Sequence, residues 1–278
     1  MKIKEAIYHQ PLRKLFVDTL IKRKLSNRII GRFADSRASA SIIKKFEKDY
    51  HINRSLFKKP FTDGFHTLNE FFTREYLEKT IKKAFPKNSA ANLHSPAEGF
   101  ISIQTKINTE SIIQAKGFTY SLSELLGKNS KAYNNGTMIK IRLTPKEYHH
   151  VHYFDNGSII SFKDIKGNYY TSDYPATNEI KNVFCKSHRH ITEIKTEKFG
   201  RITYVEIGAT FVGTIVQNNN LGDSVKYGDK KSMFKFGGST LILLFEKGRL
   251  NLDKRLSMLV NSGKEAYVKL GESIGSRA

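Results

Sequence analysis

The stretch KFGGSTLILLFEKG, residues 235–248, joins a pair of glycines to an uninterrupted apolar run. Leu241 to Phe245 are consecutive apolar residues, and a run of this kind closed by Gly248 predicts a fully buried β-strand. The strand is entered through Gly-Gly-Ser-Thr at 237–240. A turn that requires positive φ would explain the glycines. A chemical role for the serine is the other explanation, and these residues alone leave both open.

The sequence before this strand begins with helical patterns. Residues 42–50 place apolar side chains on one stripe, and residues 67–81 begin with Thr67 and Glu70 at capping-box spacing, followed by good helix formers. Thr144, Pro145 and Glu147 predict a further short helix at the start of TPKEYHH, residues 144–150. Ser121 and Glu124 predict another helix of one or two turns in SLSELLGK, residues 121–128, stopped by Gly127. We therefore expect helices in the first third of the chain and two short helices near its middle.

Strand patterns dominate from about residue 93. Short alternating runs are separated by turn residues, and residues 137–143 alternate most clearly. The tail from Leu250 returns to a mixture of helix and loop. Because helices and strands do not alternate regularly, we predict an α+β fold. Its helical N-terminal layer covers residues 1–92, and a mostly antiparallel, barrel-sandwich-like β body with a short C-terminal segment covers residues 93–278.

The chain is strongly basic. Its 278 residues contain 47 Lys and Arg against 26 Asp and Glu, a net charge of +21. Such a charge attracts nucleic acid, an acidic membrane surface or anionic metabolites. We expect no nucleic-acid partner, because no known nucleic-acid-binding signature accompanies the charge. A single cysteine, Cys185, excludes an intramolecular disulfide and a Cys-rich metal site.

Basic residues concentrate at the N-terminus, where residues 1–50 hold 13 Lys and Arg against 5 Asp and Glu. After Pro11 the spacing of Leu12, Leu15, Phe16 and Leu20 predicts an amphipathic helix. This helix would either lie on an anionic bilayer or pack on the body of the protein, or do both. We find neither a secretory signal nor a run of about 18 apolar residues that would span a membrane.

Several residues could support catalysis, but each has an ordinary explanation when taken alone. The histidines cluster at 149–152 and at 188–190. Their spacing is a weak indication of a metal site, and we expect none. A histidine could also act as a general base. Glu98 and Ser239 lie in Gly-containing segments and would, by themselves, be turn residues.

Together these segments resemble the phosphatidylserine decarboxylase family along nearly the whole chain. The matching pieces follow one order: LSNRIIGRFADS (25–36), TLNEFFTRE (67–75), SPAEGFI (95–101), IIQAKGFTYSLSELLG (112–127), RLTPKEYHHVHYFDNG (142–157), EIGATFVGTIVQ (206–217), FKFGGSTLILLFEKG (234–248) and YVKLGESIG (267–275). Eight matches in one order are far more specific than any single motif.

The resemblance implies a protein that cuts itself. In this family a Gly-Ser bond is broken and the serine becomes a pyruvoyl group. Here the bond would be Gly238–Ser239, which would give a chain of residues 1–238 and a chain of residues 239–278 that remain associated as a heterodimer, with further dimerisation left open. The pyruvoyl group derived from Ser239 would be the cofactor, and neither a metal nor pyridoxal phosphate would be needed.

The resemblance also implies roles for individual residues. His152 takes the position of the general base, and Glu98 stands where the family has the aspartate that orients it. His149 matches the histidine assigned to decarboxylation, whereas His150 replaces an arginine and receives no role. Arg189 fits the arginine of an Asn-x-Arg motif, either as a structural residue or as a ligand for a substrate phosphate or carboxylate.

The implied activity is decarboxylation of phosphatidylserine to phosphatidylethanolamine and CO₂. The enzyme would act as a peripheral protein at the cytoplasmic face of the cell membrane, with anionic phospholipid as its partner. Two alternatives remain at this point: a decarboxylase for a related amino acid or serine lipid, and a membrane-binding relative that is never cleaved.

Overall fold

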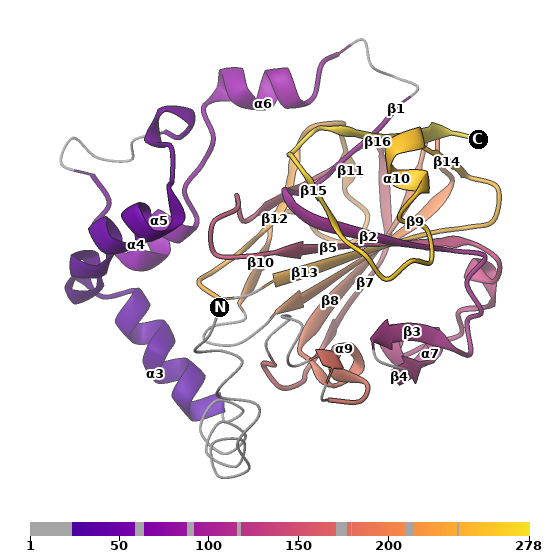
Figure 1. Cartoon of the computed structure of the whole chain (residues 1–278), viewed down its shortest axis with the longest axis horizontal. Helices are drawn as coiled ribbons and strands as arrows, with labels where there is room; N and C mark the ends of the chain where they lie inside the picture. Colours follow the sequence, from indigo (N-terminus) through magenta and orange to yellow (C-terminus); the bar gives the residue numbers. More distant parts are fainter. Residues whose placement is uncertain are drawn as a thin grey trace.

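The computed structural model describes residues 24–58, 64–87, 92–115, 118–170, 177–178, 180–208, 214–237 and 239–278 (Figure 1). Short helices dominate before the first strand: α3 (Lys24–Ala34), η1 (Arg37–Ile42), α4 (Ile43–Tyr50), η2 (Arg54–Leu56), α5 (Leu68–Phe72) and α6 (Glu78–Ala84). They lie to one side of the sheets in Figure 1. The helix expected after Pro11 falls outside the described residues. Within the described ranges, every helix is too short or too polar to cross a bilayer.

The continuous helix predicted over residues 67–81 is wrong. Thr67 caps α5 as expected, because its hydroxyl accepts a hydrogen bond from the Glu70 amide. The helix nevertheless stops at Phe72, and α6 begins only at Glu78. Between them the Arg74 side chain is buried and donates to the carbonyls of residues 146 and 147. These tertiary contacts override the helix propensity of the segment.

The short helix predicted over residues 144–150 is also wrong. The Glu147 carboxylate accepts from the Thr144 amide, as in a capping box, but only a turn forms. The carbonyls of Lys146 and Glu147 are bound by Arg74 instead of continuing a helix. The chain then enters strand β6 (His150–His152).

The main sheet has eight strands, and its neighbouring strands run antiparallel. β13 (Ser239–Phe245), predicted from the apolar run, lies at its centre, and all seven residues are buried. The order is β11 (Ser224–Val225), β7 (Gly157–Ile165), β8 (Arg189–Thr196), β9 (Arg201–Gly208), β13, β5 (Thr137–Leu143), β2 (Gly99–Thr105) and β15 (Ala266–Val268).

Both faces of β13 are covered, which explains why its sequence is apolar without alternation. Leu241, Leu243 and Phe245 belong to the larger core, which two three-stranded sheets help to close. Ile242 and Leu244 face the other core, with the hairpin β3 (Ile112–Ala115) and β4 (Phe118–Tyr120) and the helices α7 (Leu122–Leu126) and α9 (Val183–Lys186).

The two small sheets come from segments far apart in the chain. One has the order β1 (Asn92–His94), β16 (Ser273–Arg277), β14 (Leu250–Leu252); the other has β10 (Ile215–Gln217), β12 (Lys230–Phe234), β6. The C-terminal tail was predicted as helix and loop, yet besides α10 (Lys254–Ser257) it contributes β14, β15 and β16. These strands are short and are formed by pairing with distant partners, which the local pattern does not reveal. The α+β class itself is confirmed.

Candidate functional site

Ser239 is the first residue of β13 and is completely buried. Its neighbours across the sheet are Leu143 of β5 and Gly208 of β9. Its hydroxyl finds no hydrogen-bond partner among the residues that the structure describes. A buried hydroxyl without a partner costs free energy, so this oxygen is held in place by the strand rather than by its own hydrogen bonds. Gly238 lies outside the described residues.

The segment that leads into Ser239 is held by the helical layer. The Phe236 amide donates to the side-chain oxygen of Asn69 on α5, 2.8 Å away. The side-chain nitrogen of Asn69 donates in turn to the Asp35 carboxylate, also at 2.8 Å. The Phe72 ring packs on Phe236 at 5.2 Å between centroids. Helix α5 therefore fixes the chain shortly before the serine.

His149 lies against the same segment. Its ring packs against Phe72, tilted by 36°, at 3.8 Å between centroids, and its carbonyl accepts from the Phe234 amide at 2.9 Å. Nδ1 donates to the Glu147 carbonyl at 2.9 Å, which leaves the Nε2 lone pair available. Nε2 is buried and has no hydrogen-bond partner among the described residues. Burial, followed by the charge of Arg74, lowers the pKa of His149 well below its usual value.

His152 is held in the same way. Nδ1 donates to the Gly228 carbonyl at 2.8 Å, and Nε2 lies 3.4 Å from the Tyr148 hydroxyl. Burial lowers its pKa to about 4, and that of His150 likewise to about 4. The imidazole of His152 is therefore neutral at pH 7, with a proton on Nδ1 and a lone pair on Nε2. That is the tautomer a general base requires.

Glu98 does not contact His152 directly. Its two carboxylate oxygens accept from the hydroxyls of Tyr76, at 2.6 Å, and Tyr267, at 2.5 Å. The Tyr76 ring stacks on Tyr148 at 4.2 Å, and Tyr148 reaches Nε2 of His152. The carboxylate and the imidazole are thus connected by two stacked tyrosines.

The main chain ties the Glu98 turn to β6. The His152 amide donates to the Pro96 carbonyl at 2.8 Å, and the Ser95 hydroxyl closes the turn by donating to the Ala97 carbonyl at 2.6 Å. A Cβ atom on Gly99 would lie 2.5 Å from the Arg142 carbonyl oxygen, so a glycine is required directly after Glu98. The residues of SPAEG therefore position the carboxylate close to the strand that bears His152.

Arg189 is buried at the start of β8, and each guanidinium nitrogen donates to main-chain carbonyls. Nε bonds the carbonyl of Leu125 at 2.7 Å, and Nη2 bonds that of Glu124 at 2.9 Å. Nη1 bonds the carbonyls of Cys185 and Ser187 at 2.6 and 2.9 Å. These bonds secure the end of α7 and favour the structural one of its two expected roles.

A buried ion pair, which sequence reasoning missed, lies on the same face of the sheet as Ser239. Glu206 stands opposite Leu241 in the register of β9 and β13. Its carboxylate accepts from Lys231 at 2.6 Å, from Gln217 at 2.6 Å and from Ser232, and both charged side chains are fully buried. Burial lowers the pKa of Lys231. The sequences around the two residues, KKSMF (230–234) and RITYVEIG (201–208), gave no indication that these charges would meet.

The Gly228 carbonyl and Tyr148 were likewise not predicted. The carbonyl orients His152 but comes from a turn, and a carbonyl has no sequence signature of its own. The tyrosine stands beside the histidines in YHHVHYF, where its aromatic character alone would have suggested core packing.

Comparisons with known proteins give one consistent result. The family model described as phosphatidylserine decarboxylase matches residues 68–276. A phosphatidylserine decarboxylase proenzyme of Ruminiclostridium cellulolyticum is 37% identical over 95% of this chain and 87% of its own length. Proenzymes of the same description from Clostridium perfringens and Clostridium kluyveri are 36% and 38% identical, covering 97% and 96% of this chain and 91% and 90% of theirs.

The neutral histidines predict a fold that weakens in mild acid. Their folded-state pKa values lie below the value near 6.5 of an unfolded chain. Below about pH 6.5 each of these histidines therefore binds a proton in the unfolded chain but not in the folded chain. The free energy of unfolding falls by about 1.4 kcal/mol per pH unit for each such histidine. Glu147, whose pKa is raised by burial, acts in the opposite direction but is a single group.

We expect the free energy of unfolding in urea to be lower at pH 5 than at pH 7.5. A Ser239→Ala background, in which the expected cleavage serine is missing, serves for all measurements. His152→Gln should reduce the difference between the two pH values, whereas His51→Asn, at an exposed position, should not. Equal or greater stability at pH 5 would contradict the prediction.

Proposed function

Because the chain belongs to the phosphatidylserine decarboxylase family, we propose that it cuts itself between Gly238 and Ser239 and then converts phosphatidylserine to phosphatidylethanolamine and CO₂. One observation carries the proposal: the serine of the family's cleavage motif is buried at the start of a central strand, and its hydroxyl has no hydrogen-bond partner among the residues that the structure describes. A group that must attack its own main chain has to be held rigidly and without competing hydrogen bonds. The proenzyme relatives match nearly the whole chain.

The first step is the attack of the Ser239 hydroxyl on the Gly238 carbonyl. A C–O bond forms, the Gly238–Ser239 C–N bond breaks, and the chain is joined by an ester. His152 Nε2 takes the hydroxyl proton and returns a proton to the freed amine. Loss of the Ser239 α-proton then expels the Gly238 carboxylate and leaves dehydroalanine, and addition of water releases ammonia and leaves the pyruvoyl group.

The structure is compatible with a pyruvoyl group at residue 239, since β13 would hold it at the edge of the core, beside the segment that contacts His149. When formed, the group supplies a carbonyl that captures the substrate amine and accepts electrons as CO₂ leaves. We assign His149 to this second reaction. Its neutral ring, fixed through Nδ1, leaves Nε2 to hold or move a proton in a site from which water is excluded.

We propose that Glu98 is the carboxylate that stabilises the protonated form of His152. The Tyr76 hydroxyl and the stacked Tyr148 support this role, because they connect its charge to the imidazole across a buried region where screening by water is weak. In a catalytic triad the acid also fixes the tautomer of the histidine. Here the Gly228 carbonyl fixes the tautomer of His152, because it accepts the proton on Nδ1. The longer glutamate side chain then needs no direct contact with the ring.

The N-terminal region, residues 1–92, is the part that we propose to contact an anionic membrane, as a peripheral attachment at the cytoplasmic face. In α3, Ile29 and Phe33 are one helical turn apart and are 61% and 43% exposed. Arg32 and Arg37 are exposed nearby, and α3 contains no acidic residue. Exposed apolar residues with flanking cations are what an interfacial helix presents to anionic lipid.

Self-cleavage gives the first test. We expect the intact-mass spectrum of the purified protein to contain two chains, residues 1–238 and a chain beginning at a blocked residue 239. Ser239→Ala should remain one chain of 31.8 kDa and lose all decarboxylase activity towards phosphatidylserine vesicles. Ser262→Ala, an exposed serine downstream of the bond, is the matched control and should mature normally. A single uncleaved wild-type chain would refute the proposal, and cleavage without activity on this lipid would favour a related serine-lipid or amino-acid substrate.

The role of Glu98 is tested by timing cleavage on denaturing gels after cell-free synthesis. Glu98→Gln keeps the shape but removes the charge, and it should slow cleavage about 100-fold, the lower end of what proton-transfer catalysis contributes. Tyr267→Phe removes one hydrogen bond to the carboxylate and leaves the charge, so it should slow cleavage far less. Glu98→Asp should cleave at least as fast as the wild type. Wild-type cleavage by Glu98→Gln would remove Glu98 from the mechanism.

Membrane attachment is tested by flotation with vesicles that contain phosphatidylserine and with vesicles of phosphatidylcholine alone. The double variant Ile29→Ser, Phe33→Ser should bind anionic vesicles at least about tenfold more weakly, because it loses the insertion of two apolar side chains. Ile113→Ser, at an exposed apolar residue of β3 far from α3 in Figure 1, is the control. Binding should also fall as salt is raised. Equal binding by the double variant would assign attachment to other residues.

A further inference from the structure

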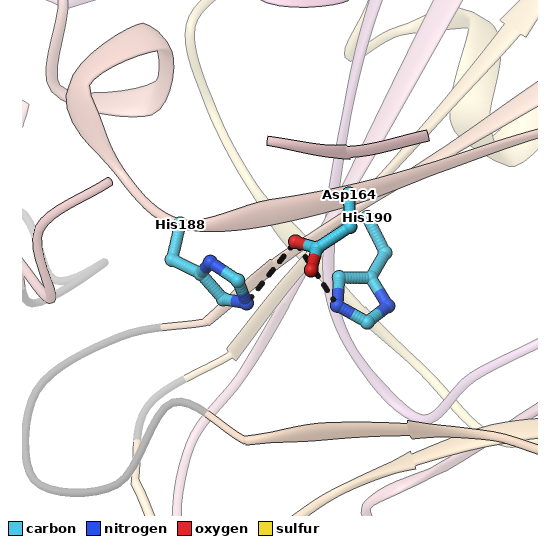
Figure 2. A group of neighbouring side chains, drawn as sticks. All are labelled: Asp164, His188 and His190. Atoms are coloured by element: carbon cyan, nitrogen blue, oxygen red, sulfur yellow. Dashed lines mark ion pairs between the residues drawn. The ribbon is translucent and has the colours of Figure 1, made fainter. Parts of the chain in front are cut away.

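A group of three metal-ligand side chains lies on β7 and β8, outside the catalytic residues assigned above. Asp164 is near the end of β7, His190 is near the start of β8, and His188 directly precedes β8. Asp164 and His190 are opposite each other in the register of the two strands. Directly opposed residues of an antiparallel pair project to the same face, and so do residues two apart along an extended chain. Figure 2 shows the two imidazoles on either side of the Asp164 carboxylate.

Both imidazoles lie close to the same oxygen of this carboxylate. His188 Nε2 is 3.6 Å and His190 Nε2 is 3.5 Å from Asp164 Oδ1. One candidate ligand atom from each of the three residues lies within 4.8 Å of the others. Zinc bound tetrahedrally at 2.0–2.2 Å by nitrogen and oxygen has ligand atoms about 3.3–3.5 Å apart. The two nitrogen-to-oxygen distances are close to this value, so little movement of Asp164 relative to either imidazole is needed.

We propose that Asp164, His188 and His190 bind a divalent transition-metal ion of the zinc class. Two imidazoles and one carboxylate are ligands that zinc accepts in sites with three protein ligands and one open position. The sequence alone did not lead us to expect a metal here, because the two histidines lack a third ligand nearby in the chain. The antiparallel pairing of β7 with β8 supplies it.

The side chains are arranged before any ion arrives. The side chains of His188 and His190 are 8% and 13% exposed, and that of Asp164 is 31% exposed, so the site is closed on the protein side and open on one side. Lys166 is paired with the other carboxylate oxygen, Oδ2, which leaves Oδ1 to face the histidines. Because the Lys166 side chain is mostly exposed, it can keep this pairing or leave it without disturbing the fold.

A polar side chain contacts the ring of His190 from behind. The Gln217 amide nitrogen is 3.2 Å from Nδ1 of His190, and its amide is held between Glu206 and Lys231. This contact places an amide N–H donor on Nδ1 and so favours the tautomer with the proton on Nε2. An ion bound at Nε2 requires the proton on Nδ1, where the Gln217 amide nitrogen cannot accept it, so Gln217 opposes binding at His190. Outer groups tune the affinity of a metal site in this way.

The position of the group indicates what the ion would do. β7 and β8 are joined by the connection over residues 166–188, and the three ligands lie where that connection leaves and re-enters the sheet. An ion bound there would cross-link the two strands at the base of the connection. Through β9, this end of the sheet is next to the start of β13, since the Gly208 amide donates to the His188 carbonyl and Gly208 pairs with Ser239.

The test measures metal binding by the purified full-length protein, prepared without a histidine tag and stripped with a chelator. Calorimetric titration with Zn²⁺ should give one equivalent per chain, and Co²⁺ should produce the visible absorption of a low-coordinate site. Bound Zn²⁺ should also raise the melting temperature. Asp164→Asn, His188→Gln and His190→Gln should each abolish the binding. Gln217→Ala should not weaken it, because the amide that favours the other tautomer of His190 is removed.

Two control variants separate this site from other ligands. His51→Asn removes an exposed histidine, and Cys185→Ser removes the single thiol, and both should bind zinc as the wild type does. Circular dichroism checks that each ligand variant is folded. Absence of stoichiometric binding by the wild-type protein, or unchanged binding by folded variants of the three ligands, would overturn the proposal. The outcome does not depend on self-cleavage or decarboxylation, because binding alone is measured.

Discussion

Burial of β13 on both faces is the constraint on which the site depends. Leu241, Leu243 and Phe245 are fixed in one core, and Ile242 and Leu244 in the other. Burial of each such side chain contributes about 1.5–3 kcal/mol. A shift of the strand by one residue would exchange its two faces between two differently shaped cores. The position of the first residue, Ser239, is therefore set by the packing of the six residues that follow it in the strand.

The helical layer fixes the segment that precedes Ser239. β13 fixes Ser239 from the C-terminal side, and Asn69 with Phe72 fixes the preceding segment from the N-terminal side. The same Phe72 ring packs against the ring of His149. The region proposed to meet the membrane is thus in direct contact with the segment that would be cleaved. Truncation of this region would remove part of the site and not only an anchor.

Local patterns predicted what depends on local interactions. The apolar run at 241–245 could only be a buried strand, and Thr67 could be recognised as a cap because capping involves residues three apart. The prediction of a helix extending to residue 81 was wrong because Arg74 binds carbonyls more than seventy positions away. The prediction of helix and loop in the C-terminal tail was wrong because its strands pair with distant segments.

The same distinction applies to the site. Ser239, His149 and His152 could be proposed as site residues from motifs, since each stands within a short recognisable stretch. The Gly228 carbonyl, the Tyr76–Tyr148 stack and the pairing of Asp164 with His190 arise only from the fold. Glu98 lies between these cases, because the motif identifies the residue but not the tyrosines that bind it.

The electrostatic design of the site follows from its burial. A charged imidazole would be costly in this interior, and both His149 and His152 avoid it by donating Nδ1–H to a main-chain carbonyl and remaining neutral. The carboxylate of Glu98, which the proposed mechanism uses, is held at a less buried position by two phenol hydroxyls. That carboxylate would act on the imidazole through stacked aromatic rings that exclude water. The imidazole can therefore be uncharged at rest and still be stabilised when it takes a proton, which are the two conditions that a general base must meet.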